Sequence, residues 1–320
     1  MKFKLALMVL ATLAAVAHAD PIVVSVNSLN SFGNLSGTKL HWRGGFEILS
    51  ADKTFGGLSG LTLSDDCTGL LAVSDKGAWF RASLRYEGEN LASIFNSELS
   101  PMLDSTGKPP RSKSRGDAEA VSYLEGGRYM VGFETRTRIG VYDIGKRGLK
   151  ARFQLLKSPK SIVNGPSNGE VESVGQFKSG RWQGHYLAIS EHNLDRDGNI
   201  RGWLWRSEEI VPFSIKRLED YRITDAAILP NGDIIILERS FGPSLLPGMA
   251  LRRINASAIA NGATVEPQLL FSGRALFYAI DNMEGVALCE RDDETRITIV
   301  SDDNFNPRQR TLLLQFAYEP

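Results

Sequence analysis

Short apolar runs separated by polar, glycine-containing turns recur along most of the chain, a pattern typical of strands. One unit repeats: a carboxylate opens an apolar run, a turn follows, and a second apolar run ends in another carboxylate. The clearest copy pairs residues 168–174 with 186–191. Further copies pair 117–121 with 129–134, 282–286 with 297–302, and, more weakly, 57–61 with 70–75 and 223–227 with 234–238. Equivalent positions lie about 53 to 60 residues apart, which leaves room for four strands per unit and predicts a β-propeller.

The predicted fold class is therefore all-β, and residues 20–320 form a single propeller domain. Five units are visible, and two further strands are expected at 22–26 and 39–49. We expect these N-terminal strands to complete a blade with the C-terminal strands, which closes the ring and removes its edges. Six blades are favoured, with five or seven as alternatives. One helix is expected within 88–103, because Leu91, Ile94, Phe95 and Leu99 share a helical face.

The first nineteen residues are typical of a secretory signal peptide. Lys2 and Lys4 precede an apolar run, and residues 17–19 form a small-x-small cleavage site, which predicts cleavage after Ala19. The mature protein is then periplasmic or secreted. No apolar run is long enough to cross a bilayer.

Charge excludes two classes of partner. Without the two leader lysines the net charge is about −2, which gives no electrostatic case for binding nucleic acid or a membrane surface. We expect a monomer whose partner is a small anionic ester.

Cys67 and Cys289 are the only cysteines. Both lie near the turns of hairpins, in the first and last clear repeats, which are neighbours in a closed ring. In an oxidising compartment they can pair as a disulfide. The alternative is two separate buried thiols.

The repeated carboxylates are the candidate site. The first strand of a propeller blade lines the central channel, so acids that recur at one point of that strand should gather at one mouth of it. Such a cluster resists ionisation unless a cation or basic neighbours offset the repulsion. Carboxylate oxygens without His or Cys partners favour Ca²⁺. The candidate metal ligands are Glu119, Glu134, Glu172, Glu191, Glu238, Glu284 and Asp302.

Three of these acids, Glu119, Glu172 and Glu284, are also the catalytic candidates, which would hold the metal or activate water. Basic and polar residues near the second-strand ends are candidates for binding an anionic substrate. These substrate-binding candidates are Lys76, Arg136, His192, Arg239 and Asn304. The alternative is structural: the acids cap strands or pair with arginines of neighbouring blades.

One local motif adds to the calcium hypothesis. Residues 193–199 carry oxygen donors at alternate positions and Gly198 at the sixth, as in the first half of a calcium loop. The closing glutamate is missing, and Asp197-Gly198-Asn199 is also an ordinary hairpin turn.

The linked motifs resemble the bacterial phytase-like family, which is also described as having esterase-like activity. The resemblance is carried by residues 117–120, 168–172, 229–233, 237–241, 282–285 and 301–305, and it covers about Gly56 to Phe316. It implies an exported β-propeller that hydrolyses phosphoesters or carboxylic esters with calcium. Two positions depart from the acidic pattern: Ser59 replaces a carboxylate, and Glu170 adds a charge.

These observations favour a hydrolase of anionic esters, phosphoesters first, that uses Ca²⁺. Two alternatives remain. One is a non-catalytic propeller that binds a ligand or partner, and the other is a lactonase-like carboxylic esterase.

Overall fold

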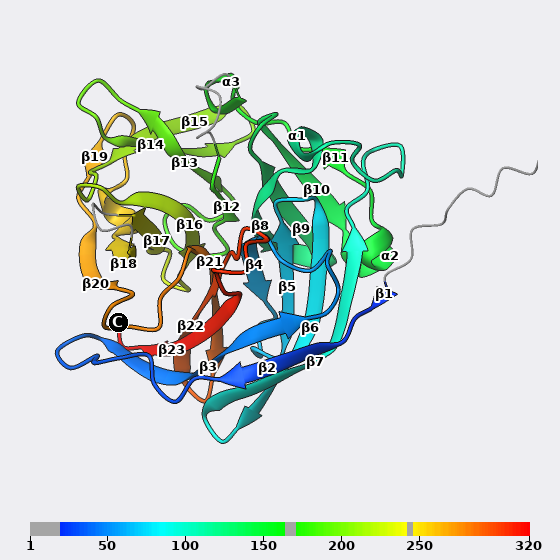
Figure 1. Cartoon of the computed structure of the whole chain (residues 1–320). Helices are drawn as coiled ribbons and strands as arrows, with labels where there is room; N and C mark the ends of the chain where they lie inside the picture. The colour runs from blue at the N-terminus through cyan, green and yellow to red at the C-terminus, as the bar shows by residue number, and fades with distance from the viewer. Residues whose placement is uncertain (1–19, 164–170, 242–245) are drawn as a thin grey trace, which may run out of the picture.

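The computed structural model describes residues 20–163, 171–241 and 246–320. These residues form five sheets around a central axis, as a view down that axis shows (Figure 1). The first strand of each repeat lies innermost, and successive strands step outward. The all-β propeller expected from the sequence is therefore confirmed.

The blades follow the order of the chain. Blade 1 contains β4 (Leu58–Leu63), β5 (Gly69–Ser74), β6 (Ala78–Glu87), β7 (Asn90–Pro101) and the two-residue β1 (Asp20–Pro21). Blade 2 contains β8 (Ala118–Leu124), β9 (Arg128–Phe133), β10 (Arg138–Asp143) and β11 (Gln154–Leu155). Blade 3 contains β12 (Ser173–Gln176), β13 (Tyr186–Leu194), β14 (Ile200–Arg206), β15 (Glu209–Ile215) and β19 (Thr264–Val265). Blade 4 contains β16 (Arg222–Ile228), β17 (Ile234–Phe241), β18 (Pro247–Ile254) and β20 (Gln268–Arg274).

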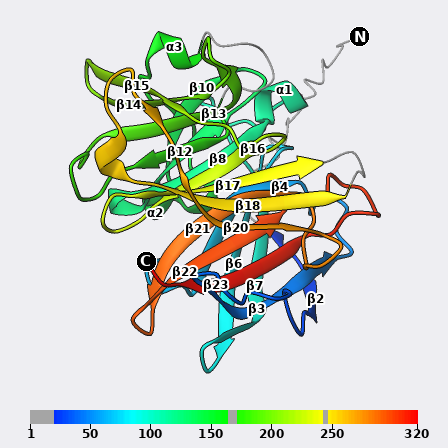
Figure 2. The same cartoon turned by 90° about the vertical axis from the view of Figure 1, so that its left-hand side faces the viewer.

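Blade 5 closes the ring. It contains β21 (Met283–Arg291), β22 (Glu294–Ser301) and β23 (Leu312–Tyr318) from the C-terminus, and β3 (Leu40–Ser50) and β2 (Val24–Ser28) from the N-terminus. Strand β23 pairs with β3, as the side view also shows (Figure 2). The predicted closure by the two ends is confirmed. Because the N-terminal strands complete this blade rather than add one, the described residues form five blades instead of the favoured six.

Helices are few and short in the described residues. They are α1 (Lys113–Gly116), α2 (Ile144–Arg147), α3 (Lys160–Val163), and the 3₁₀ turns η1 (Glu125–Gly127), η2 (Gly148–Lys150) and η3 (Ala256–Ala258). None of these helices is long and apolar enough to cross a membrane. The signal peptide expected at residues 1–19 lies outside the described residues.

The helix expected within 88–103 is wrong, because β7 occupies this segment. Leu91, Ile94 and Leu99 are all buried, and Ile94 and Leu99 follow Leu91 by three and eight residues, as on one face of a helix. Two irregularities in the β6–β7 pairing cause this spacing. Each gives β7 one residue more than β6 has at that point and resets the alternation of faces, so a bulged strand imitates a helical pattern.

The innermost strands approach one another closely. A Cβ atom on Gly60 of β4 would lie 2.8 Å from the backbone oxygen of Glu119 in β8. On the other side, a Cβ atom on Gly285 of β21 would lie 2.8 Å from the Leu61 side chain. Glycine at these two positions therefore lets neighbouring blades meet at the axis.

A disulfide joins the first and last blades. Cys67, in the β4–β5 turn, bonds to Cys289 of β21, with 5.4 Å between the Cα atoms. Both residues belong to the buried apolar cluster shared by these blades. Of the two alternatives that the sequence left open, the structure therefore has the disulfide and not two separate thiols.

Candidate functional site

The repeated acids gather at one mouth of the channel because of how the inner strands pair. The start of each first strand lies beside the end of its second strand: Leu58 pairs with Ser74, Ala118 with Phe133, and Met283 with Ser301. The next residue of the chain after each second strand is Asp75, Glu134 or Asp302. All three acids therefore emerge on the same face as the first-strand acids.

A bulge near the start of four first strands turns one side chain away from the regular alternation. The residues at these bulges are Ser59, Glu119, Thr224 and Glu284. Bulges commonly re-aim a side chain at the edge of a functional site. In blade 3 the matching residue is Glu172, whose backbone amide donates to the Ile189 carbonyl. An inner set of Glu119, Glu172 and Glu284 thus faces an outer set of Asp75, Glu134, Glu191 and Asp302. Together these seven carboxylates form the acidic set.

Blade 4 departs from the predicted register by one residue. Ile223 pairs with Glu238, so Glu238 matches the last paired residue of the other blades, and Arg239 takes the position that holds a carboxylate elsewhere. A one-residue step turns a side chain to the opposite face of a strand. The Glu238 carboxylate is accordingly fully buried against Arg252, with 2.6 Å between Oε1 and Nη2. The structure therefore does not bring Glu238 to the other candidate ligands.

Asp225, the acid of the first strand of blade 4, lies one position beyond the bulge and likewise stays apart from the other acids. One of its carboxylate oxygens accepts a hydrogen bond from the Ala226 amide, and the other accepts one from the Val286 amide of blade 5. Its role is to link two inner strands. Thr224, not Asp225, occupies the position of Glu119 and Glu284.

Two groups of carboxylates lie close enough to share a cation. Oxygens of Asp117, Glu119 and Glu134 lie within 4.8 Å of one another, and so do oxygens of Glu134, Glu172 and Glu191. Glu134 belongs to both groups. The Oδ1 atom of Asp117 is buried and has no hydrogen-bond partner in the described part of the chain. An all-oxygen set with an orphaned buried oxygen fits a hard cation such as Ca²⁺.

Burial and crowding oppose ionisation of this set. Burial, followed by neighbouring carboxylates, raises the pKa of Glu119 and of Glu172 well above the usual range. Burial raises the pKa of Glu284 to about 8, although Arg239 acts in the other direction. Burial likewise raises the pKa of Asp302 to about 7. Protons therefore occupy part of the set at neutral pH unless a cation replaces them.

Arg239 carries a positive charge among these acids and contacts both the inner and the outer set. Its Nη1 atom donates to Asn282 Oδ1 at 3.0 Å, and Nη2 lies 3.4 Å from Glu191 Oε1. Its Nε atom lies 3.2 Å from Glu284 Oε1, and Asn282 Nδ2 donates to the same oxygen at 2.8 Å. Although burial opposes its charge, these carboxylates raise its pKa. Arg239 thus holds Glu191 and Glu284 in place.

The other substrate-binding candidates take different positions. Lys76 is exposed, and its Nζ atom lies 2.9 Å from the centroid of the Phe305 ring. His192 is exposed on β13. Arg136 lines a separate pocket with other arginines, described below. Asn304 lines a cavity together with Arg239.

This last cavity adjoins the acidic set and is basic. It has a volume of about 590 Å³ and is lined by Arg239, Arg308 and Arg310 among other residues. Asp281 partly neutralises the positive charge of this cavity, because Arg310 Nε donates to Asp281 Oδ2 at 3.3 Å. An anionic group that enters here meets guanidinium groups on one side and the acidic set on the other.

The sequence prediction omitted Asp117 and Lys113 from the candidate residues. Asp117 stands two positions before Glu119, as Asn282 does before Glu284, so the repeat itself contained a signal. Lys113 Nζ lies 2.8 Å from Asp75 Oδ2 and 3.7 Å from Asp117 Oδ1. It comes from the short helix α1, outside the repeated strands, and only the fold brings it to the acids.

The loop at 193–199 is a hairpin turn between β13 and β14. Asp195 Oδ1 accepts hydrogen bonds from the amides of Asp197 and Asn199. Asp195 therefore closes a hairpin turn, as the ordinary-turn alternative requires.

Comparison with known proteins gives one family. The family described as "Phytase-like: Esterase-like activity of phytase" matches residues 53–305. None of the curated proteins compared with the chain matches it. Among solved structures, "Structure of U3-55K" is similar with a TM-score of 0.41 and 9% sequence identity, covering 81% of this chain and 95% of that one.

Proposed function

Since the chain belongs to the phytase-like family, we propose that it hydrolyses anionic esters, phosphoesters first, at the channel mouth where the carboxylates converge. The observation that carries the proposal is the meeting of two shared carboxylate groups with a basic cavity at Arg239. Family membership alone points to ester hydrolysis on a propeller. The substrate class and the use of calcium are inferred from the residues of this site.

Two cation positions are proposed, joined by Glu134. Asp117 and Glu119 would complete one, and Glu172 and Glu191 the other. Calcium bound there would supply Lewis-acid stabilisation of negative charge that develops on the substrate. Glu191 also contacts Arg239 and Arg222, so this second position is partly neutralised by the protein itself.

Arg239 and the arginines of the adjoining cavity would bind the anionic group of the substrate. Guanidinium groups match the oxygens of phosphate and carboxylate in pairs. Arg308 is exposed and has no ion-pair partner in the described residues, which leaves its charge available. Asn304 lines the same cavity and would add a neutral donor.

Glu284 is the proposed proton carrier. Its pKa of about 8 lets it hold a proton near neutral pH, while its contacts to Asn282 and Arg239 fix its direction. A group with a pKa near the working pH is suited to general acid–base catalysis. It would donate that proton to the leaving oxygen as the ester bond breaks, and the resulting carboxylate would recover a proton from the attacking water.

The test is an assay of purified protein on phytate, nitrophenyl phosphate and nitrophenyl acetate, first with calcium and then with a chelator. We expect calcium-dependent turnover of the phosphate esters, and loss of turnover in Glu284→Gln. Faster turnover of the acetate or of a lactone would favour the carboxylic esterase, which the family description also fits. No turnover of any ester in either condition would overturn the proposal and favour a binding propeller.

A further inference from the structure

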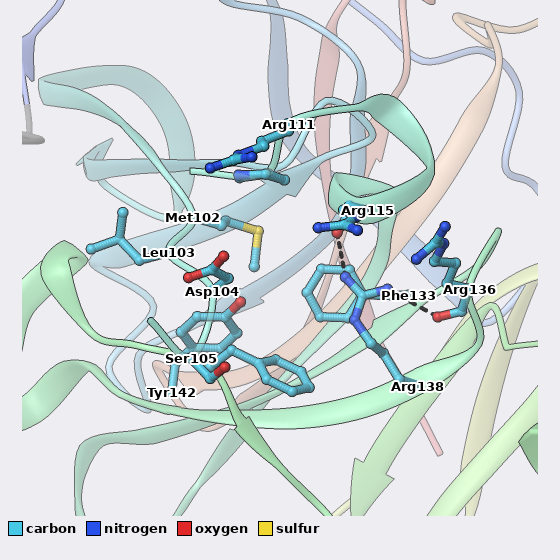
Figure 3. A pocket seen from close by; sticks show the side chains of 12 residues that line it. Met102, Leu103, Asp104, Ser105, Arg111, Arg115, Phe133, Arg136, Arg138 and Tyr142 are labelled. Carbon is cyan, nitrogen blue, oxygen red and sulfur yellow. Dashed lines mark hydrogen bonds between the residues drawn. The ribbon is translucent and has the colours of Figure 1, made fainter. Parts of the chain in front are cut away.

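A second pocket lies between blades 1 and 2, on the face where the acids converge. It has a volume of about 270 Å³ and is formed by the segment after β7, the residues around α1 and the ends of β9 and β10. Four arginines line it, and Figure 3 shows their side chains grouped around it. These arginines are Arg111, Arg115, Arg136 and Arg138.

The positive charge of this pocket is not neutralised within the described residues. None of its four arginines forms an ion pair in the part of the chain that the structure describes. Asp104 is the one acid among the described lining residues. Its Oδ1 accepts hydrogen bonds from the amides of Thr106 and Lys108 and is held by its own turn.

Arg138 is fixed in the pocket and shapes its floor. Its guanidinium lies over the Phe133 ring, 3.9 Å from the centroid. Its Nη1 atom donates to the Arg136 carbonyl at 2.9 Å, and Nη2 donates to the Arg115 carbonyl. The Arg138 guanidinium is therefore held in a fixed orientation over the Phe133 ring. Burial lowers the pKa of Arg138. Flat apolar groups can stack against such a plane.

The remaining surface is apolar. Met102, Tyr142 and Phe153 line the pocket beside the arginines. At ~30 Å³ per water, the cavity has the volume of about nine water molecules, which suits a small organic molecule rather than a polymer. An inorganic oxyanion would leave this apolar surface uncovered.

We propose that this pocket binds a small aromatic carboxylate, independently of the ester site. The carboxylate would lie between the exposed guanidinium groups of Arg111 and Arg115, with Arg136 beside them. The ring would stack on the Arg138 plane and contact Phe153. Paired guanidinium–carboxylate bonds supply the affinity, and the aromatic floor supplies the preference for a flat body.

The pocket is linked to the acidic set by short connections. Only Thr135 separates Glu134 of the acidic set from Arg136, and its hydroxyl donates to Asp117 Oδ2. Helix α1 presents Lys113 to Asp75 on one side and Arg115 to the pocket on the other. A ligand here would lie next to the ester site without using its carboxylates.

The test is titration of the purified protein with 4-fluorobenzoate, followed by ¹⁹F NMR in the presence of a chelator, so that failure of the calcium proposal does not affect it. We expect saturable binding that weakens as salt increases. Arg111→Gln and Arg115→Gln should each weaken binding about tenfold, since each removes a charge-assisted contact. Both residues are exposed, so we expect unchanged melting temperatures.

Arg85→Gln is the matched control, because Arg85 is also exposed beside an aromatic ring, Phe95, but lies outside the pocket. It should bind the probe as the unmodified protein does. 4-Fluorobenzyl alcohol, which lacks the charge, should not bind, and inorganic phosphate should compete poorly. Absence of saturable binding, pocket variants that bind as tightly as the unmodified protein, or displacement by phosphate as effective as by benzoate would overturn the proposal.

Discussion

Replacing Glu172 by Gln tests whether the Glu172 carboxylate binds a cation or has only a structural role. In the described residues the Glu172 carboxyl has no hydrogen-bond or ion-pair partner, yet it is buried among other acids. Burial and the neighbouring carboxylates raise its pKa, which favours the neutral carboxyl in the cation-free protein, and Gln has the shape of that neutral form. We therefore expect Glu172→Gln to change the cation-free stability by less than about 1 kcal/mol.

The effect should appear when calcium is added. A ligand at about 100 times its dissociation constant stabilises the folded state by about 2.7 kcal/mol. For a domain of about 300 residues, with an unfolding entropy of about 2.1 cal/mol/K per residue, that is a rise in melting temperature of about 4 °C. The unmodified protein should show this rise, and Glu172→Gln should lose most of it. Differential scanning fluorimetry with calcium and with a chelator measures both quantities.

Glu238→Gln is the matched control, because Glu238 is a buried glutamate outside the acidic set. Its loss leaves Arg252 buried without its partner, which should cost about 3–5 kcal/mol. The calcium-induced rise should persist. The reasoning is refuted if Glu172→Gln destabilises the cation-free protein as much as Glu238→Gln does, or if it keeps the full calcium response.

Three further predictions follow from the same geometry. The disulfide closes a loop of 222 residues, so the double change Cys67→Ala and Cys289→Ala should lower the free energy of unfolding by roughly 5 kcal/mol. Urea denaturation measures this loss, and an unchanged midpoint would contradict the prediction. Glu284 binds its proton more tightly in the folded than in the unfolded protein, so with chelator present the free energy of unfolding should fall by up to roughly 5 kcal/mol as pH rises from about 4.5 to about 8. Glu284→Gln should flatten this pH dependence. A rise in stability over the same window would show that Glu284 is ionised in the folded protein. Arg239→Gln should lower kcat/KM for phosphate esters at least about tenfold while Arg85→Gln does not, and equal activity of the two variants in steady-state kinetics would exclude Arg239 from anion binding.

The sequence predicts the propeller because its signal is repeated. The acids of blades 1, 2, 3 and 5 recur at matching positions, and a propeller brings such positions together at the axis. The N-terminal strands indicated closure of the ring. Their pairing with β23, which decides the number of blades, depends on contacts across nearly the whole chain.

The register in which neighbouring strands pair was harder to predict from the sequence. In the run Leu237-Glu238-Arg239, either charged residue can face the channel, and the choice depends on the register in which β16 pairs with β17, which no local pattern reveals. The helical spacing of Leu91, Ile94 and Leu99 misled for the same reason. Bulges reset alternation, so a periodicity argument fails where they occur.

The basic side chains around the acidic set come from segments outside the repeated strands. Lys113 reaches Asp75, and Arg308 and Arg310 reach the cavity at Arg239, from segments far from those residues in the chain. Their sequences carry no repeat that could align them with the blades. Only folding brings them to the acidic set.

Isothermal titration of the protein with calcium, in two buffers of different ionisation enthalpy, tests most directly whether the converging acids hold a cation. Because Glu119 and Glu172 have raised pKa values, calcium should bind with release of protons to the buffer, and the change Glu119→Gln with Glu172→Gln should abolish binding. Absence of binding by the unmodified protein, or equal binding by the double variant, would contradict the account.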